Sequence, residues 1–174
     1  MACRKDTAPP KPKADAAKID ACTLLSKQDI EALQGSTITD TKSSENTDGD
    51  FRVAQCFYTA AEFNKSVSLA LMQKHPTKAN TRTPKQFWQE TFGRASEKKE
   101  KGEKEAGEEK ERRTPPKKIS GVGDDAYWVP NRFGGTLYVL KGEAFISVSV
   151  GGTDPEQAKI DKCKALAQKA ISRM

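Results

Sequence analysis

The sequence predicts an α+β fold: a mostly antiparallel sheet of about five to six strands, with N-terminal, middle and C-terminal helices packed against it. Several short segments alternate apolar and polar residues with a period of two, as half-buried strands do. These segments come in runs joined by turns, which favours antiparallel pairing. Three other segments combine helix-capping residues with apolar residues at helical spacing.

The 174-residue chain is expected to form a single domain over residues 19–174, preceded by a tether over residues 1–18. Two segments, 1–18 and 96–118, contain almost no core-forming residues, and the roughly 130 residues that remain suffice for one core. Residues 97–113 carry seven Glu and seven Lys or Arg, so their charges cancel. We therefore expect residues 96–118 to be a charged insertion that extends the preceding helix into solvent.

The first predicted helix covers residues 27–34. Ser26 is a good N-cap, Asp29 stands three residues later to complete the cap, and Gly35 ends the helix. A short edge strand and a polar loop are expected to follow. Residues 51–60 and 65–73 predict two strands joined by a turn near 62–64, because Val67, Leu69 and Leu71 alternate with small or polar residues.

The middle helix begins at the capping residue Thr83, with Pro84 in its first turn. Trp88 and Phe92 lie four residues apart on one face, and such aromatic residues usually pack on the sheet. The alternative interpretation is a surface for a ligand or partner, formed by four aromatic residues: Trp88, Phe92, Tyr127 and Trp128.

The C-terminal part predicts strands over residues 126–129, 136–140 and 144–150, followed by a closing helix. Asp154 is the expected N-cap of that helix, with Pro155 in its first position. Its apolar stripe consists of Ile160, Cys163, Ala167, Ala170 and Ile171.

No catalytic constellation is recognisable, so the sequence predicts a protein that is not an enzyme, with no cofactor and no metal. The only histidine, His75, stands in a proline-containing loop, and no Cys/His grouping has zinc spacing. The run 121–126 imitates a dinucleotide fingerprint, but it follows a charged linker and opens a strand. Asp124 and Asp125 are more typical of a turn than of acid/base chemistry; a small hydrolase is the third alternative.

The net charge of +6 is partly local, since residues 1–18 alone contribute +3. A basic stripe with stacking aromatic residues is not visible, so nucleic-acid binding is not expected. A soluble cytosolic protein that binds nucleic acid or an acidic partner is the leading alternative.

The N-terminal run of Pro, Lys and Ala favours extended, solvated chain. Ala2-Cys3 followed by this run is typical of a mature bacterial lipoprotein, in which the signal peptide has been removed and the cysteine carries lipid. A lipid on Cys3 with lysines nearby would attach the protein to a membrane. The alternative is a cytosolic protein with a disordered tail.

The cysteines at 22, 56 and 163 differ in context. Cys163 lies in the apolar stripe of a helix, whereas Cys22 precedes the first helix and Cys56 lies in a strand. In an exported protein Cys22 and Cys56 would form a disulfide, with pairings to Cys163 as rivals; in the cytosol all would be thiols.

The segments "DACTLLSKQDIEALQG", "CFYTA", "GVGDDAYW", "LYVLKG" and "ISVSV" together resemble small bacterial envelope lipoproteins of unknown function. The resemblance covers roughly residues 19–172. It implies an extracytoplasmic lipoprotein, a Cys22–Cys56 bridge and a PsbP-like α/β sandwich, but no activity. Cys163 and the charged run 97–113 depart from the pattern.

We therefore expect a non-catalytic protein of the bacterial cell envelope, anchored outside the cytoplasm by lipid on Cys3. It would bind an unidentified ligand or envelope protein through one face of its sheet.

Overall fold

A single antiparallel sheet of seven strands organises the chain. The structure is a computed structural model that describes residues 18–78, 82–93 and 114–174. The strand order is β1-β2-β3-β7-β6-β5-β4, and every pairing is antiparallel. The strands are β1 (Ile38–Asp48), β2 (Phe51–Ala60), β3 (Val67–Lys74), β4 (Lys117–Lys118), β5 (Asp125–Val129), β6 (Thr136–Lys141) and β7 (Ala144–Val150).

The α+β class is confirmed, but the expected number of five to six strands is wrong. The additional strand is β4, which has two residues, both exposed lysines, and therefore no apolar alternation that a sequence pattern could reveal. β1 was expected to be short, and it runs for 11 residues. Its side chains beyond Ile38 are polar on both faces, so it also lacks the alternation of a half-buried strand.

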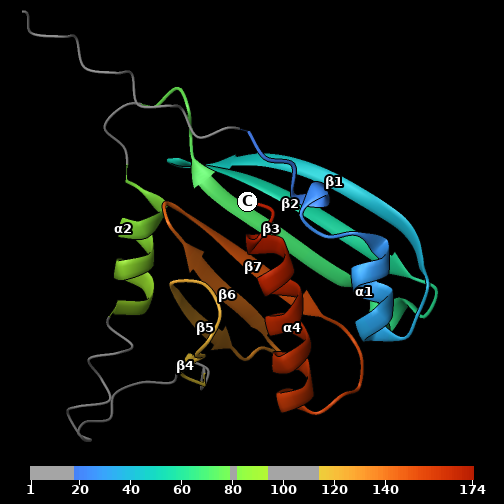
Figure 1. Cartoon of the computed structure of the whole chain (residues 1–174). Helices are drawn as coiled ribbons and strands as arrows, with labels where there is room; N and C mark the ends of the chain where they lie inside the picture. The colour runs from blue at the N-terminus through green and yellow to red at the C-terminus, as the bar shows by residue number, and fades with distance from the viewer. Residues whose placement is uncertain (1–17, 79–81, 94–113) are drawn as a thin grey trace, which may run out of the picture.

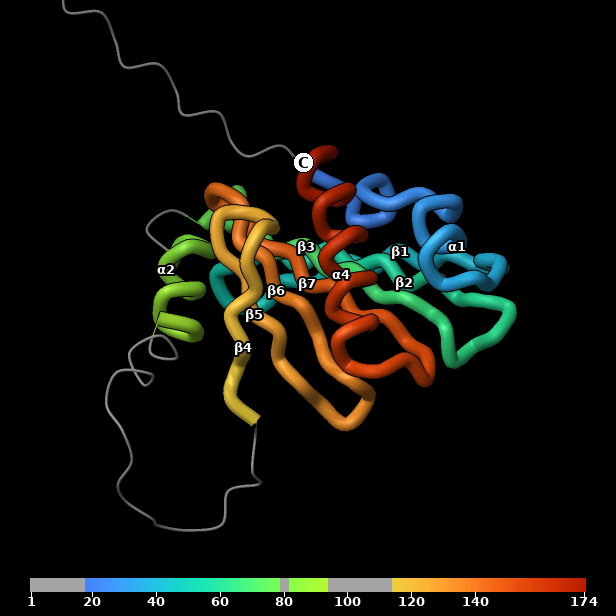
Figure 2. The backbone as a smooth tube through the Cα atoms, turned by 60° about the horizontal axis from the view of Figure 1, so that its bottom comes forward, coloured from blue at the N-terminus to red at the C-terminus, as the bar shows by residue number. Residues whose placement is uncertain are grey.

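One face of the sheet carries the main hydrophobic core. It is covered by the short 3-10 turn η1 (Ala21–Thr23) and by the helices α1 (Lys27–Gln34) and α4 (Glu156–Ile171). Figures 1 and 2 show α4 along the middle of the sheet with α1 on the same side. The alternating strand residues that enter this core include Cys56, Tyr58, Leu69, Leu71, Leu137, Val139, Ile146 and Val148.

The cap residues of the first two helices are those that the sequence predicts. Ser26 and Asp29 form a reciprocal capping box at α1, and Gly35 ends it with a left-handed backbone at φ 62°. Thr83 caps α2 (Pro84–Trp88) in the same way, and the chain continues as a π-helical turn, η3 (Gln89–Gly93).

The predicted cap of the closing helix is wrong by one residue. α4 begins at Glu156, with Pro155 at the N-cap position and no side-chain cap. The carboxylate of Asp154 instead accepts a hydrogen bond from Lys162 Nζ at 2.7 Å. Asp154 therefore forms an ion pair with Lys162 in the second turn of α4 and does not cap the backbone N–H groups of the first turn.

Both ends of the described chain lie at the same end of the sheet (Figures 1 and 2). Arg173 donates hydrogen bonds to the carbonyl of Leu24 at 2.9 Å and to Asp29 Oδ2 at 2.7 Å. Lys169 donates to Asp29 Oδ1 at 2.8 Å. These two cations hold the pKa of Asp29 well below its ordinary value and tie α1 to the C-terminal end of α4.

Candidate functional site

Three of the four aromatic residues predicted as a ligand face form a buried cluster under α2 and η3. The ring centroids of Trp88 and Phe92 are 4.6 Å apart, and Phe92 stacks on Tyr127 at 4.9 Å. Their exposed fractions are 3%, 5% and 3%, respectively. Leu140 and Phe145 complete the cluster. These side chains therefore fix α2 and η3 to the sheet, as the structural interpretation of the helical stripe predicted.

The fourth aromatic residue, Trp128, lies on the opposite face of the sheet. Tyr127 and Trp128 are successive residues of β5, so their side chains point to opposite sides. Trp128 is fully buried in the main core, where a Cβ added to Gly135 would come within 2.2 Å of its ring atom Cζ2. The four residues therefore do not share one surface.

The indole of Trp88 also has a polar contact that positions it. Its Nε1 donates to Asp125 Oδ2 at 3.0 Å, and Lys118 lies 3.5 Å from the other carboxylate oxygen. Asp125, which was one of the possible acid/base residues, thus serves the packing of α2 on β5.

The same side of the sheet has a second region, which is accessible and which we call the open face. It lies beside the aromatic cluster, and its side chains are half-buried or exposed. The alternating residues that form it are Lys42 and Ser44 of β1, Gln55 and Phe57 of β2, Ser68 and Ala70 of β3, Ser147 and Ser149 of β7, and Thr136 and Tyr138 of β6.

Strand register arranges the open face in two neighbouring rows. In one row Lys42, Phe57, Ser68 and Ser149 are cross-strand neighbours, and the Ser149 hydroxyl lies 2.7 Å from that of Thr136. In the other row the neighbours are Ser44, Gln55, Ala70, Ser147 and Tyr138. The middle of each row is small, whereas Phe57 stands at one side and Tyr138 at the other.

This arrangement suits binding rather than bond-breaking chemistry. Phe57 is 38% exposed, although β2 is paired with a neighbouring strand on each side. Small hydroxyl-bearing side chains between two aromatic rings allow close approach, hydrogen bonding and ring stacking. The Tyr138 hydroxyl is a protonated donor at neutral pH, and burial raises its pKa still further above neutral.

The sequence contained a signal for the open face, although the aromatic interpretation did not use it. Ser68 and Ala70 alternate with the core residues of β3, and Ser147 and Ser149 alternate with those of β7. Two strands with a small polar side facing away from the core indicate a sheet face without bulky cover. The missing information was that β3 and β7 are neighbours, which follows only from the topology.

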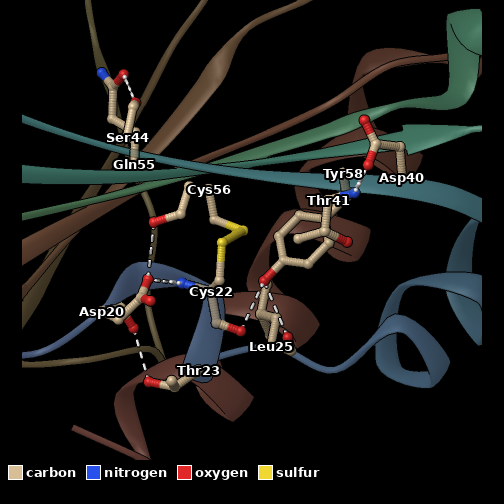
Figure 3. Close-up of a disulfide and its surroundings, with 11 residues drawn as sticks. Asp20, Cys22, Thr23, Leu25, Asp40, Thr41, Ser44, Gln55, Cys56 and Tyr58 are labelled. Atoms are coloured by element: carbon tan, nitrogen blue, oxygen red, sulfur yellow. Dashed lines mark hydrogen bonds between the residues drawn. A yellow bond between two sulfur atoms is a disulfide. The ribbon is translucent and has the colours of Figure 1, made fainter.

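A disulfide joins Cys22 to Cys56 across the main-core side of β2. Figure 3 shows Asp20 and Tyr58 on either side of it. The Asp20 carboxylate accepts from the backbone N–H of Cys22 at 2.9 Å, and the Tyr58 hydroxyl donates to the carbonyl of Leu25 at 2.9 Å. Burial raises the pKa of Tyr58 to about 12. The predicted pairing is confirmed, and the rival pairings with Cys163 are not formed.

The N-terminal end of the described chain is fastened next to this disulfide. Lys18 and Arg52 both contact Glu45 Oε2, at 3.1 and 2.8 Å. Arg52 also donates to the carbonyl of Ile19 at 3.2 Å. The bonds from Arg52 and Lys18 lower the pKa of Glu45 to about 2. The predicted lipidation residue, Cys3, lies outside the described residues, as does the charged run 97–113.

The possible catalytic residues have other partners or are exposed. His75 is half-buried, with the Thr77 hydroxyl 3.1 Å from its Nδ1. Asp124 accepts from the backbone N–H of Gly142 at 2.7 Å and from Lys141 at 3.3 Å, and the backbone bond lowers its pKa. Within the described part of the chain, no group of three or more His, Cys, Asp or Glu side chains could hold a metal ion.

Cys163 is buried in α4 as a free thiol. Its Sγ donates to the carbonyl of Val148 at 3.5 Å, and burial raises its pKa to about 12. A protonated, inaccessible thiol is unreactive at neutral pH, so Cys163 behaves as a small core residue.

No family model, no curated protein and no solved structure matches this chain. Among the residues that the structure describes, no helix is both long enough and apolar enough to cross a membrane.

Proposed function

We propose that the protein is a non-catalytic, lipid-anchored protein of the bacterial cell envelope that binds an envelope protein or a small ligand through the open face. The observation that carries the binding proposal is the accessible strip between Phe57 and Tyr138. An antiparallel sheet can leave one polar face to solvent, and this face adds an exposed aromatic ring, Phe57, beside its small polar side chains.

The disulfide between Cys22 and Cys56 supports a location outside the cytoplasm, because disulfides persist in oxidising compartments. The anchor is supported by Cys3 and by the polar run that follows it. Lys18 and Ile19 are fixed at one end of β1 and β2, so a tether leaving there would hold that end of the domain toward the membrane and leave the open face accessible.

The anchor is tested by expressing the protein behind a lipoprotein export signal that places Cys3 at the cleavage site. We expect incorporation of labelled palmitate and fractionation with membranes, with both lost in Cys3→Ser. Membrane fractionation that is unchanged in Cys3→Ser would refute the anchor.

The open face is tested by photo-crosslinking in cells, with a benzophenone amino acid at position 57. We expect a discrete crosslinked product from this position and none from position 161 on the solvent side of α4. Phe57→Ser should abolish retention of that product in pull-downs, whereas the matched variant Phe63→Ser should not. Phe63 is also an exposed phenylalanine, at 71%, but it lies in a turn outside the open face. An equal loss of retention in both variants would indicate nonspecific hydrophobic binding and contradict the proposal.

A further inference from the structure

We propose that the outer edge of β1 pairs with β1 of a second copy of this chain, so that two sheets continue into one across a two-fold axis. The proposal concerns the backbone edge of β1, which borders the open face at Lys42 and Ser44. It holds with or without the lipid anchor. It rests on the difference between the two edges of the sheet and on the charge pattern of β1.

The two edges of the sheet are built differently. The β4 edge has two residues, Lys117 and Lys118, and follows Pro115–Pro116. Short length, lysines and proline are the features that block strand addition at an edge. β1 is 11 residues long, and within the described chain it pairs only with β2.

β1 is also regular along most of its length. Successive residues from Asp40 to Asp48 pair with successive residues of β2, and the register shifts only between Ile38 and Asp40. The strand contains no proline. Its outer edge therefore offers a row of backbone donors and acceptors, which an antiparallel strand can satisfy. Within this row the Thr41 N–H already donates to Asp40 Oδ1 at 2.8 Å, so pairing would exchange that local bond for one to the partner strand.

The charges of β1 select one register for self-pairing. A two-fold axis at Ser43 overlaps the whole strand, because Ile38 and Asp48 are equally distant from it. Asp40 then lies opposite the partner's Asn46, and Lys42 lies opposite the partner's Ser44. Glu45 lies opposite the partner's Thr41, so no like charges face each other.

The neighbouring registers are disfavoured. A pairing must shift by an even number of residues to keep the two faces of the sheet aligned. A shift of two in one direction places Lys42 opposite the partner's Lys42. A shift of two in the other direction places Asp40 opposite the partner's Asp48. In the full register, each charged side chain of β1 therefore faces an uncharged one. In the two adjacent registers, side chains of like charge face each other and repel.

The experiment uses the full chain with the Cys22–Cys56 disulfide intact and Cys3→Ser, so that no dimer arises from a Cys3 disulfide. Sedimentation equilibrium should show association from a mass of 19.1 kDa to twice that value as concentration rises. Ser44 faces Lys42 of the second copy and Asn46 faces its Asp40. A charge added at Ser44 should therefore change the dissociation constant in the opposite direction to the same charge added at Asn46. Ser44→Asp should tighten the dimer and Ser44→Lys should weaken it, each by about two- to tenfold in dissociation constant.

At Asn46 the signs should be reversed, because this residue faces the partner's Asp40: Asn46→Lys should tighten and Asn46→Asp should weaken. The same charge therefore acts in opposite directions at two positions of one strand, which a change in net charge cannot produce. A monomer at millimolar concentration would overturn the proposal. A dimer whose dissociation constant shifts in the same direction for the same charge at both positions would overturn it as well. Ser44 and Asn46 are exposed, and where one variant melts early, the opposite charge at that position carries the test.

Discussion

Loss of the Cys22–Cys56 disulfide should be the most destabilising single covalent change to the domain. The bond closes a loop between residues 34 apart in sequence. In the chain-entropy model, closing a loop of this length restricts the unfolded chain enough to stabilise the fold by about 4 kcal/mol. A typical domain has a net stability of about 5–15 kcal/mol, so much of the fold's stability depends on this one bond.

The measurement is urea unfolding of Cys3→Ser protein with and without dithiothreitol, compared with the Cys22→Ala/Cys56→Ala double variant. Without reductant, the double variant should be less stable than the parent by about 3–4 kcal/mol. It should also show a larger m-value, because its unfolded chain is more expanded. Dithiothreitol should destabilise the parent by a similar amount and leave the double variant unchanged.

Cys163→Ala is the matched control, since it removes a buried thiol that forms no bond to another cysteine. It should lose about 1 kcal/mol of stability through the lost packing, and it should retain the full effect of dithiothreitol. The reasoning fails if reductant still destabilises the double variant. It also fails if the double variant unfolds with the parent's free energy, which would mean that the unfolded chain is already restricted without the bond.

Two further substitutions test how the helices and turns are held. Asp29→Asn should cost about 2 kcal/mol in thermal unfolding at pH 7, because Asp29 accepts charge-assisted bonds from Lys169 and Arg173 while only 10% exposed. Since the folded-state pKa of Asp29 is lowered, its stabilisation is complete above the ordinary value of 3.8 and is lost as pH falls below that value, so the variant should show a shallower loss of stability in acid. Gly135→Ala should destabilise by at least about 2 kcal/mol, since its Cβ would lie 2.2 Å from Trp128 at φ +149°. Gly142→Ala, at φ +59° with open space around it, should cost only about 1 kcal/mol; equal losses in the two glycine variants would refute the clash argument.

Local patterns were sufficient where one element carried the whole signal. The caps at Ser26 and Thr83 and the alternation of Val67, Leu69 and Leu71 predicted their elements well. These features depend on contacts within a few residues, so neighbouring letters contain the information. β4 was missed because its two lysines carry no apolar alternation, and they form a strand only through pairing with β5.

The site was harder to predict because it depends on which strands are neighbours. The helical spacing of Trp88 and Phe92 suggested a ligand surface, but these two side chains pack on one half of the sheet face and cover it. The middle of the uncovered half consists of serines and an alanine, whose alternation along β3 and β7 marks a face only once these strands are known to be neighbours. Trp128 was grouped with Tyr127 although alternation along β5 separates them, so this error was avoidable from the sequence.

Alternation along β2 also couples the disulfide to the open face. Cys56 is 1% exposed and bonds Cys22 on the core side, whereas the next residue, Phe57, is 38% exposed on the other side. Under the proposed anchoring, a pull from the residues before Lys18 would enter the domain at Lys18 and Ile19 and reach Cys22 within a few residues. The bond then passes that load to the middle of β2, which is held by neighbouring strands on both sides. The strand that displays Phe57 is thereby joined covalently to Cys22, so the proposed attachment before Lys18 would leave the geometry of the open face unchanged.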